Sequence, residues 1–383
     1  MTKKEKQRKD KNEQDITARS ETIREIIYSP VVIAHITENI SDLFATRLQD
    51  KKSIQIHYTS QMNSRPHLGT TMSLMTAFAL GSHLSEDYKI PAKLNFNVLE
   101  NAPTEQKVIN GITYTKMYHD IYRGGTPVSE LYLNSFIGLL DSLQAKSNVG
   151  YELLPYKQFQ EIPFVRKTLL EILDRQAEFT PLLAPSDRKL HIRFPCPDCK
   201  YMEKQGIKTA IKERAEKYDV TLESECFEHG KHQIRITPNN KDFVDMNTPV
   251  RTVAREALFI EDSKKRNALN LVVMGGDLIH LDELVVSEGL SLLGYNYKDR
   301  PTRVYAPLVE DWSGAKLSKS VYVRSGTYGY LPSGFLDIDD FKVQFGNEGV
   351  DKLWKEAKAW VTDPKKLFRN YSVDYFVQLL RTS

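Results

Sequence analysis

The chain has few cysteines, no long apolar run and no large excess of charge of either sign. Three cysteines in 383 residues cannot form the disulfide framework of a small secreted protein. Two of them occur as Cys196-Pro-Asp-Cys199, a spacing that indicates metal or redox chemistry in a reducing compartment. The longest apolar stretches, such as residues 75–80 and 269–274, fall far short of the ~20 residues that a membrane span requires. With no visible signal peptide, the sequence predicts a cytoplasmic protein without a membrane segment.

The charges nearly balance. Lys and Arg number 53 and Asp and Glu number 50, giving a net charge of +3, so the whole molecule is not a basic nucleic-acid coat and any such binding must use local patches. Residues 3–13 hold six basic and three acidic side chains and no apolar one, which predicts a flexible basic tail over residues 1–15. The tail is either a solubilising extension or a weak arm for RNA phosphates.

Hydrophobic periodicity divides the rest of the chain into segments. A length of 383 residues, at roughly 150 residues per domain, allows two or three domains. Two N-terminal helices are predicted over residues 16–50. Strand, glycine turn, helix and strand follow at 53–59, 70–84 and 93–99, which indicates a βαβ unit and a parallel sheet. Later segments are predicted as mostly helical at 113–177, short strands at 190–236, a buried strand at 269–274, and helices around 354–360 and 375–380.

The first chemical motif is Arg65-Pro-His-Leu-Gly-Thr70, between a strand and a helix. A helix N-terminus has unpaired N–H groups and a positive dipole end, and a glycine there lets a nucleotide approach the backbone. His67 would donate a hydrogen bond to a phosphate oxygen as charge develops. The alternative is a histidine that merely caps or packs at a turn.

The second motif is Gly314-Ala-Lys-Leu-Ser-Lys-Ser320. Lys316 and Lys319, with Ser318 and Ser320, would fold over a polyphosphate and neutralise a leaving pyrophosphate. Alone, such a loop is usually a solvated surface, but its position roughly 250 residues after the first motif favours a shared site.

Together the two motifs resemble the signatures of the class I aminoacyl-tRNA synthetases, commonly called HIGH and KMSKS. His67-Leu-Gly-Thr70 is similar to the first, with Thr70 in place of the final histidine, and Lys316-Leu-Ser-Lys-Ser320 to the second, differing only at Leu317. The resemblance covers residues 50–322. It implies ATP-dependent activation of an amino acid to an aminoacyl adenylate, with Mg²⁺ on the phosphates, catalytic roles for His67, Lys316 and Lys319, and ATP contacts from Gly69, Thr70 and Ser318. The amino-acid pocket is expected near Tyr58 and Ser60, at the end of the first strand.

A third motif, Gly275-Gly-Asp-Leu-Ile-His280, follows the buried strand at 269–274. Open α/β sheets bind ligands at the ends of such strands, and an acidic side chain there accepts hydrogen bonds from ribose hydroxyls. The resemblance implies that Gly275, Gly276 and Asp277 hold the nucleoside, with His280 nearby. The alternative is a tight turn in which Asp277 caps a helix.

A fourth motif pairs Cys196-x2-Cys199 with Cys226-x2-His229, separated by 26 residues. Four sulfur and nitrogen ligands in two close pairs suit a structural Zn²⁺ site, with His232 as a substitute for His229. The connective insertion of the class I enzymes lies at this place in the chain. A short core with a zinc ribbon is most similar to the class I lysyl-tRNA synthetases, with the cysteinyl and glutamyl enzymes as alternatives.

The acceptor of the activated amino acid stays open. After Ser320 the chain has 63 residues, fewer than the anticodon-binding domain of the lysyl enzymes, so the acceptor is either the acceptor stem of a tRNA or another molecule. Rival hypotheses are a catalytically inactive synthetase-like binding protein, a nucleotidylyltransferase and a zinc-ribbon nucleic-acid module. The sequence identifies neither the amino acid nor the oligomeric state.

The predicted fold is therefore α/β, a Rossmann-like parallel-sheet nucleotide-binding core split by a zinc-ribbon insertion. The expected organisation is a tail (1–15), N-terminal helices (16–50), the first half of the core (51–150), an insertion (151–245) with its ribbon at 190–236, the second half of the core (246–322) and a helical C-terminal segment (323–383).

Overall fold

The computed structural model describes residues 37–317 and 328–381. The predicted tail, the helical prediction for 16–36, and Ser318, Lys319 and Ser320 lie outside these residues. Within them, the α-helices are α3 (Ala45–Leu48), α4 (Leu68–Tyr88), α5 (Val128–Ser147), α6 (Tyr156–Glu161), α7 (Pro163–Asp174), α8 (Gln176–Leu183), α9 (Thr248–Arg266), α10 (Ser287–Leu292), α12 (Ile338–Thr362), α13 (Pro364–Leu367) and α14 (Val373–Arg381). Short 3₁₀ turns include Ile40–Phe44 and Gly276–Leu278.

The strands alternate with these helices along most of the chain. They are β1 (Ser53–Gln61), β2 (Ala92–Leu99), β3 (Pro103–Ile109), β4 (Ile112–Met117), β5 (Tyr122–Arg123), β6 (Thr126–Pro127), β7 (Gly150–Pro155), β8 (Ile192–Arg193), β9 (Met202–Glu203), β10 (Ala210–Glu216), β11 (Asp219–Cys226), β12 (Gly230–Ile236), β13 (Asp245–Met246), β14 (Ala268–Gly275), β15 (Thr302–Ala306), β16 (Val309–Glu310) and β17 (Tyr371–Ser372).

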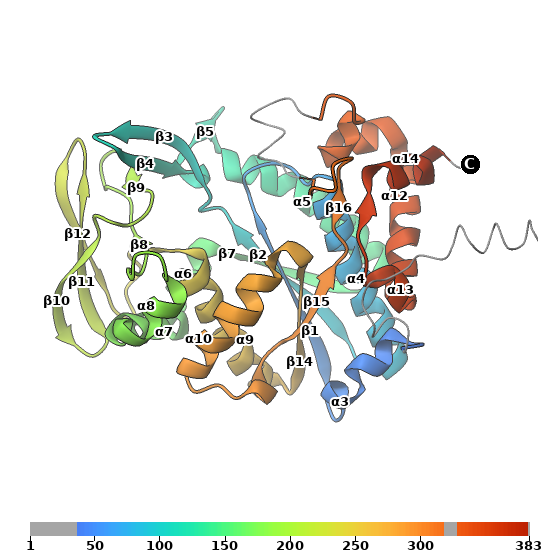
Figure 1. Cartoon of the computed structure of the whole chain (residues 1–383), viewed down its shortest axis with the longest axis horizontal. Coiled ribbons are helices and arrows are strands. Elements are labelled where there is room, and N and C mark those ends of the chain that lie inside the picture. The colour runs from blue at the N-terminus through green and yellow to red at the C-terminus, as the bar shows by residue number, and fades with distance from the viewer. Residues whose placement is uncertain (1–36, 318–327, 382–383) are drawn as a thin grey trace, which may run out of the picture.

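A five-stranded parallel sheet forms the centre of the molecule, in the order β15-β14-β1-β2-β7. β1 lies in the middle because it pairs with β14 from Ser53 opposite Ala268 and with β2 from Ile54 opposite Ala92. Strands from distant parts of the chain thus meet in one sheet, as Figure 1 shows. The predicted α/β fold with a parallel, Rossmann-like core is confirmed.

Two layers of helices cover the sheet. On one face, Ile54, Ile56 and Tyr58 of β1 join a core with α4, α5 and α12. On the other face, the ring of His57 stacks on Phe259 of α9 at 3.5 Å between centroids. Alternate side chains of a strand point to opposite faces. Since helices cover both faces, the side chains on both sides of β1 are buried, which explains why the strand is nearly continuously apolar or neutral.

His57 is fully enclosed and neutral. Its Nε2 lies 3.1 Å from Asn270 Oδ1 of β14. Burial lowers the pKa of His57 to about 3, because the charged imidazolium would lose its hydration there; the hydrogen bond with Asn270 opposes this effect. This histidine therefore belongs to the core.

The prediction that residues 113–177 are mostly helical is correct for α5 to α7, but β4, β5, β6 and β7 also fall in this segment. β7 pairs in parallel with β2, from Lys93 opposite Gly150, and becomes an edge of the central sheet. Its short run Gly150–Pro155 follows an asparagine in the left-handed conformation, Asn148 at φ 58°, which ends α5. Strand formation here depends on a partner far away in the sequence, which helical periodicity cannot detect.

The ribbon predicted at 190–236 is composed of short strands, as expected. β10, β11 and β12 form an antiparallel three-stranded sheet, and β9 pairs with β4 of the β3–β4 hairpin. These strands lie on one side of the central sheet, and α12, α13 and α14 lie on the other (Figure 1). The predicted C-terminal helices are confirmed as α12 and α14. No described helix is long and apolar enough to cross a bilayer.

Candidate nucleotide site

A cavity of about 440 Å³ lies at the carboxyl ends of β1 and β14. From β1 the chain continues to β2 on one side, and from β14 to β15 on the other. This reversal of strand order leaves a crevice, where open α/β sheets bind ligands. The cavity is lined by Tyr58, Thr59, Ser60, Gln61, Asn63, His67, Gly69, Thr70, Ser73, Met274, Gly275, Asp277, Leu278, Pro307, Leu308, Val309, Lys316 and Leu317.

His67 caps the N-terminus of α4. Its Nδ1 accepts a hydrogen bond from the Thr70 N–H at 3.3 Å, and its Nε2 lies 3.3 Å from Thr70 Oγ1. Because Nδ1 is the acceptor, a neutral ring carries its proton on Nε2, next to Thr70 Oγ1. A ligand oxygen would take this proton in place of the Thr70 hydroxyl. A Cβ at Gly69 would lie 3.0 Å from His67 Cε1, so glycine keeps room for this ring. Thr70, the departure from the first signature, therefore positions His67.

Asp277 and Lys316 form an ion pair in the lining of the cavity. Lys316 Nζ lies 2.5 Å from Asp277 Oδ2, with the two side chains 43% and 33% exposed. The other carboxylate oxygen, Oδ1, is buried and has no hydrogen-bond partner among the described residues. A Cβ at Gly275 would lie 2.6 Å from that oxygen, so a larger residue there would displace the Asp277 carboxylate from this position. The site thus offers one unused acceptor beside a lysine.

The loop before Lys316 is held by Asp311. Its carboxylate accepts hydrogen bonds from the N–H groups of Ser313 at 2.9 Å and Ala315 at 3.2 Å. Burial by itself would raise the pKa of Asp311, but hydrogen bonds from the Ser313 hydroxyl and from these two N–H groups lower it below its ordinary value. On the other side of Lys316, the N–H of buried Leu317 donates to the Val309 carbonyl at 2.8 Å. Lys316 is therefore fixed at both of its neighbours.

Tyr58 and Ser60 line the floor of the cavity at the end of β1. The Tyr58 hydroxyl donates to the Thr70 carbonyl at 3.4 Å. Burial raises the pKa of Tyr58 to about 12; a hydrogen bond with Ser73 opposes this shift, and the Asp277 charge reinforces it. At neutral pH the phenol keeps its proton and acts as a donor.

The structure does not bring every predicted residue to this cavity. Gly276 does not line it, and His280 is exposed and lies outside its lining. Conversely, sequence reasoning missed Gln61, Asn63, Ser73 and the segment 307–309. Gln61 had a detectable signal, because it ends the first strand at the ligand-binding edge of the sheet. The segment 307–309 carried no such signal in the sequence, because only the pairing of β15 with the sheet brings it to the site.

The cysteine motif forms a cluster in space. The ligand atoms of Cys196, Cys199, Cys226 and His229 lie within 4.8 Å of one another. Cys199 Sγ is 3.5 Å from Cys226 Sγ, and His229 Nδ1 is 3.6 Å from both Cys196 Sγ and Cys226 Sγ. With metal bonds of about 2.0–2.3 Å, a tetrahedral Zn²⁺ separates its ligands by such distances. The donor set and spacing fit zinc, with His229 in the cluster; His232 packs against Phe194 instead.

Comparisons with known proteins give structural similarity only. No protein-family model matches the chain, and no curated protein matches its sequence. A structure of Mycobacterium tuberculosis methionyl-tRNA synthetase in complex with methionyl-adenylate is similar at a TM-score of 0.45 and 13% identity, covering 86% of this chain and 68% of that one. Glutamate-tRNA synthetase from Elizabethkingia anophelis has a TM-score of 0.30 and 14% identity, covering 72% of this chain and 54% of that one.

Proposed function

We propose that the chain activates an amino acid with ATP, forming an aminoacyl adenylate and pyrophosphate. The observation that supports this function is the cavity at the strand-order reversal. It gathers His67 at the N-terminus of α4, the unused oxygen of Asp277, and Lys316. These groups suit three parts of one nucleotide: a phosphate at the helix end, a ribose hydroxyl at the carboxylate, and the terminal phosphates at the lysine.

The proposed reaction needs no covalent protein nucleophile. An oxygen of the amino-acid carboxylate attacks the α-phosphorus of ATP, and the bond from that phosphorus to the oxygen bridging to the β-phosphorus breaks. The electron pair leaves with pyrophosphate. The protein positions the two reactants and stabilises charge. His67 Nε2–H and the N-terminal end of α4 face the α-phosphate, and Lys316 neutralises the leaving group. Lys319, outside the described residues, is proposed to share the role of Lys316.

Metal ions have two separate roles in this proposal. Mg²⁺ arrives with the ATP phosphates and offsets their charge. Zn²⁺ is bound by Cys196, Cys199, Cys226 and His229 and stabilises the ribbon, because structural zinc sites contribute directly to folding. The four zinc ligands do not line the nucleotide cavity, so zinc takes no part in the chemical step.

The acceptor of the aminoacyl group is proposed to be the acceptor stem of a tRNA, or otherwise a small molecule or carrier. A pull-down of tRNA at low and at physiological salt distinguishes these acceptors. Electrostatic contacts weaken steeply with salt, so tRNA is the working acceptor only where binding persists at about 150 mM.

Pyrophosphate exchange into ATP tests adenylate formation directly. The purified chain is incubated with labelled pyrophosphate, MgATP and each of the twenty amino acids, with and without tRNA. We expect exchange with one amino acid. ATP binding without exchange under any condition would contradict the proposal and favour an inactive binding protein.

A further inference from the structure

A second cavity adjoins the first, and its lining is cationic. It has a volume of about 340 Å³ and shares Gln61, the last residue of β1, with the nucleotide cavity. Its remaining lining residues are Asn101, Ala102, Pro103, His191, Arg193, Lys204, Gln205, Met246, Asn247, Thr248 and Arg251. Three of these carry a positive charge at neutral pH and none is acidic.

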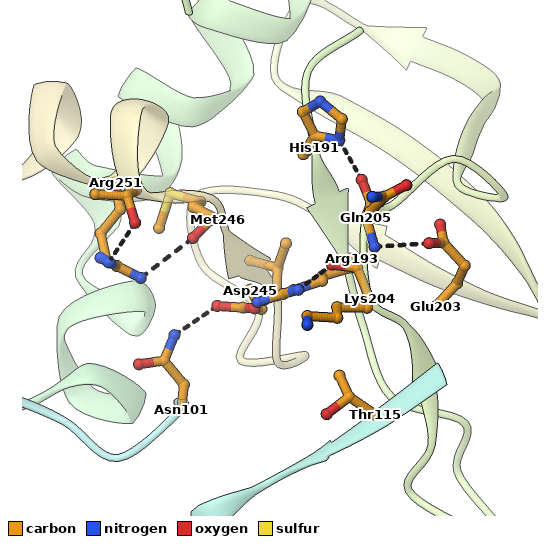
Figure 2. Close-up of polar contacts among 12 residues, drawn as sticks. Asn101, Thr115, His191, Arg193, Glu203, Lys204, Gln205, Asp245, Met246 and Arg251 are labelled. Carbon is orange, nitrogen blue, oxygen red and sulfur yellow. Dashed lines mark hydrogen bonds and ion pairs between the residues drawn. The ribbon is translucent and has the colours of Figure 1, made fainter. Parts of the chain in front are cut away.

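One nearby carboxylate is already fully used. Asp245 is completely buried. Its Oδ2 accepts from Arg193 Nε at 2.5 Å, and its Oδ1 accepts from Asn101 Nδ2 at 2.5 Å. Figure 2 shows the Asp245 carboxylate between these two side chains. Asp245 therefore balances the charge of Arg193, whereas neither Lys204 nor Arg251 has an ion-pair partner within 4.0 Å among residues 37–317 and 328–381.

Arg251 is the clearest sign of a missing partner. The residue is only 7% exposed, and among the described residues no carboxylate oxygen lies within 4.0 Å of its guanidinium. Its guanidinium donates to the Met246 carbonyl at 3.4 Å and to Thr248 Oγ1 at 3.2 Å. Nε is buried and has no hydrogen-bond partner in the described part of the chain. Figure 2 shows the Met246 contact. A buried guanidinium normally has an anionic partner.

The position of Arg251 in the fold adds to this imbalance. It lies in the first turn of α9, and this turn contains no acidic residue. The N-terminal end of a helix is already positive, so a cation there is unfavourable unless an anion is nearby. Burial also lowers the pKa of Arg251, although the Asp245 charge opposes this effect. An anion in the cavity would accept a hydrogen bond from the guanidinium, offset the positive end of α9 and compensate for the burial of the charge.

We propose that the second cavity binds a carboxylate carried by the amino acid that is activated, with Arg251 and Lys204 as its partners. The substrate is thereby of the acidic class, with its α-carboxylate in the nucleotide cavity and its second carboxylate beyond Gln61. This inference rests on the proposed adenylation. It disfavours lysine, because the charged side chains that line the cavity are cationic.

The first arm of the test compares acidic amino acids with their amides in pyrophosphate exchange. Glutamate and glutamine, and aspartate and asparagine, have nearly the same shape and differ in charge. We expect the acidic member of one pair to exceed its amide by about 10- to 100-fold in kcat/KM, because charge-assisted hydrogen bonds are lost in the amide. Exchange that is fastest with lysine or a neutral amino acid would overturn the inference and leave adenylation intact.

The second arm removes the cations. Lys204→Met, at a half-buried position on the cavity wall, should lower the preference for the acidic substrate about tenfold, chiefly through KM. Lys212→Met is the matched control, since Lys212 is a half-exposed lysine of the ribbon paired with Glu223 that does not line the cavity. Arg251→Met should have the larger effect. Preference that is unchanged in both Lys204→Met and a folded Arg251→Met would refute the assignment.

A binding measurement separates failure of this inference from failure of the proposed function. Calorimetric titration with L-glutamate, L-aspartate and their amides requires no turnover. If exchange is absent with all twenty amino acids, binding of an acidic amino acid that Lys204→Met weakens and Lys212→Met does not still supports the subsite. Absence of both exchange and such binding overturns it.

Discussion

Replacing Lys316 separates the catalytic role of this side chain from its structural one. Lys316→Met keeps a similar apolar stem and removes the ammonium group that lies 2.5 Å from Asp277. The side chains of Lys316 and Asp277 are 43% and 33% exposed, so solvent screens the ion pair. Its loss should therefore change the free energy of unfolding by less than about 1 kcal/mol.

The expected effect on catalysis is much larger. Removing one positioned donor to a developing charge typically costs about 3 kcal/mol, which is roughly 100-fold in rate. Pyrophosphate exchange should therefore fall about 100-fold in kcat/KM, while urea unfolding stays close to that of the unchanged chain. Lys264→Met is the control, because Lys264 is 48% exposed and ion-paired at 3.5 Å to Asp299, outside the nucleotide cavity. Exchange within threefold of the unchanged chain would refute the assigned role.

Three other predictions concern packing, pH and metal. Gly81→Ala should destabilise the chain by about 1–3 kcal/mol, because the new Cβ would lie 2.4 Å from Ile56 Cδ1. The control Gly138→Ala, at an exposed position in α5, should stabilise the chain by up to about 1 kcal/mol. Equal effects of the two substitutions in urea unfolding would contradict this packing argument. Because the folded pKa of His57 is about 3, below its ordinary 6.5, protons bind preferentially to the unfolded chain. Its contribution to stability is then complete above about pH 6.5 and is lost as the pH falls toward 3, by up to about 1.4 kcal/mol per pH unit; His57→Gln should flatten this slope, and an unchanged slope would count against it. Elemental analysis should find about one zinc per chain, lost in Cys226→Ser and retained in His232→Ala; a well-folded, chelator-free preparation without zinc would exclude the site.

The sequence alone determined the features that depend on local order along the chain. Alternating and helical patterns predicted β1, α4, β2 and β14, and with them the parallel sheet, because these segments carry their own periodicity. The glycine turn before α4 located His67 at a helix end. The paired spacing of three cysteines and a histidine predicted a cluster, since two close pairs can surround one ion wherever the intervening 26 residues fold.

Only the tertiary structure decided which distant residues meet. The hydrogen-bonding partner of a strand is not encoded in its own periodicity, so β7 joined the sheet against the helical pattern around it. In the same way, sheet assembly placed Lys316 against Asp277 and left His280 outside the cavity. The charge balance around Arg251 is also a tertiary property: Asp245, only six residues away in the sequence, is engaged by Arg193 and Asn101, and the cation left over becomes visible only once these partners are in place.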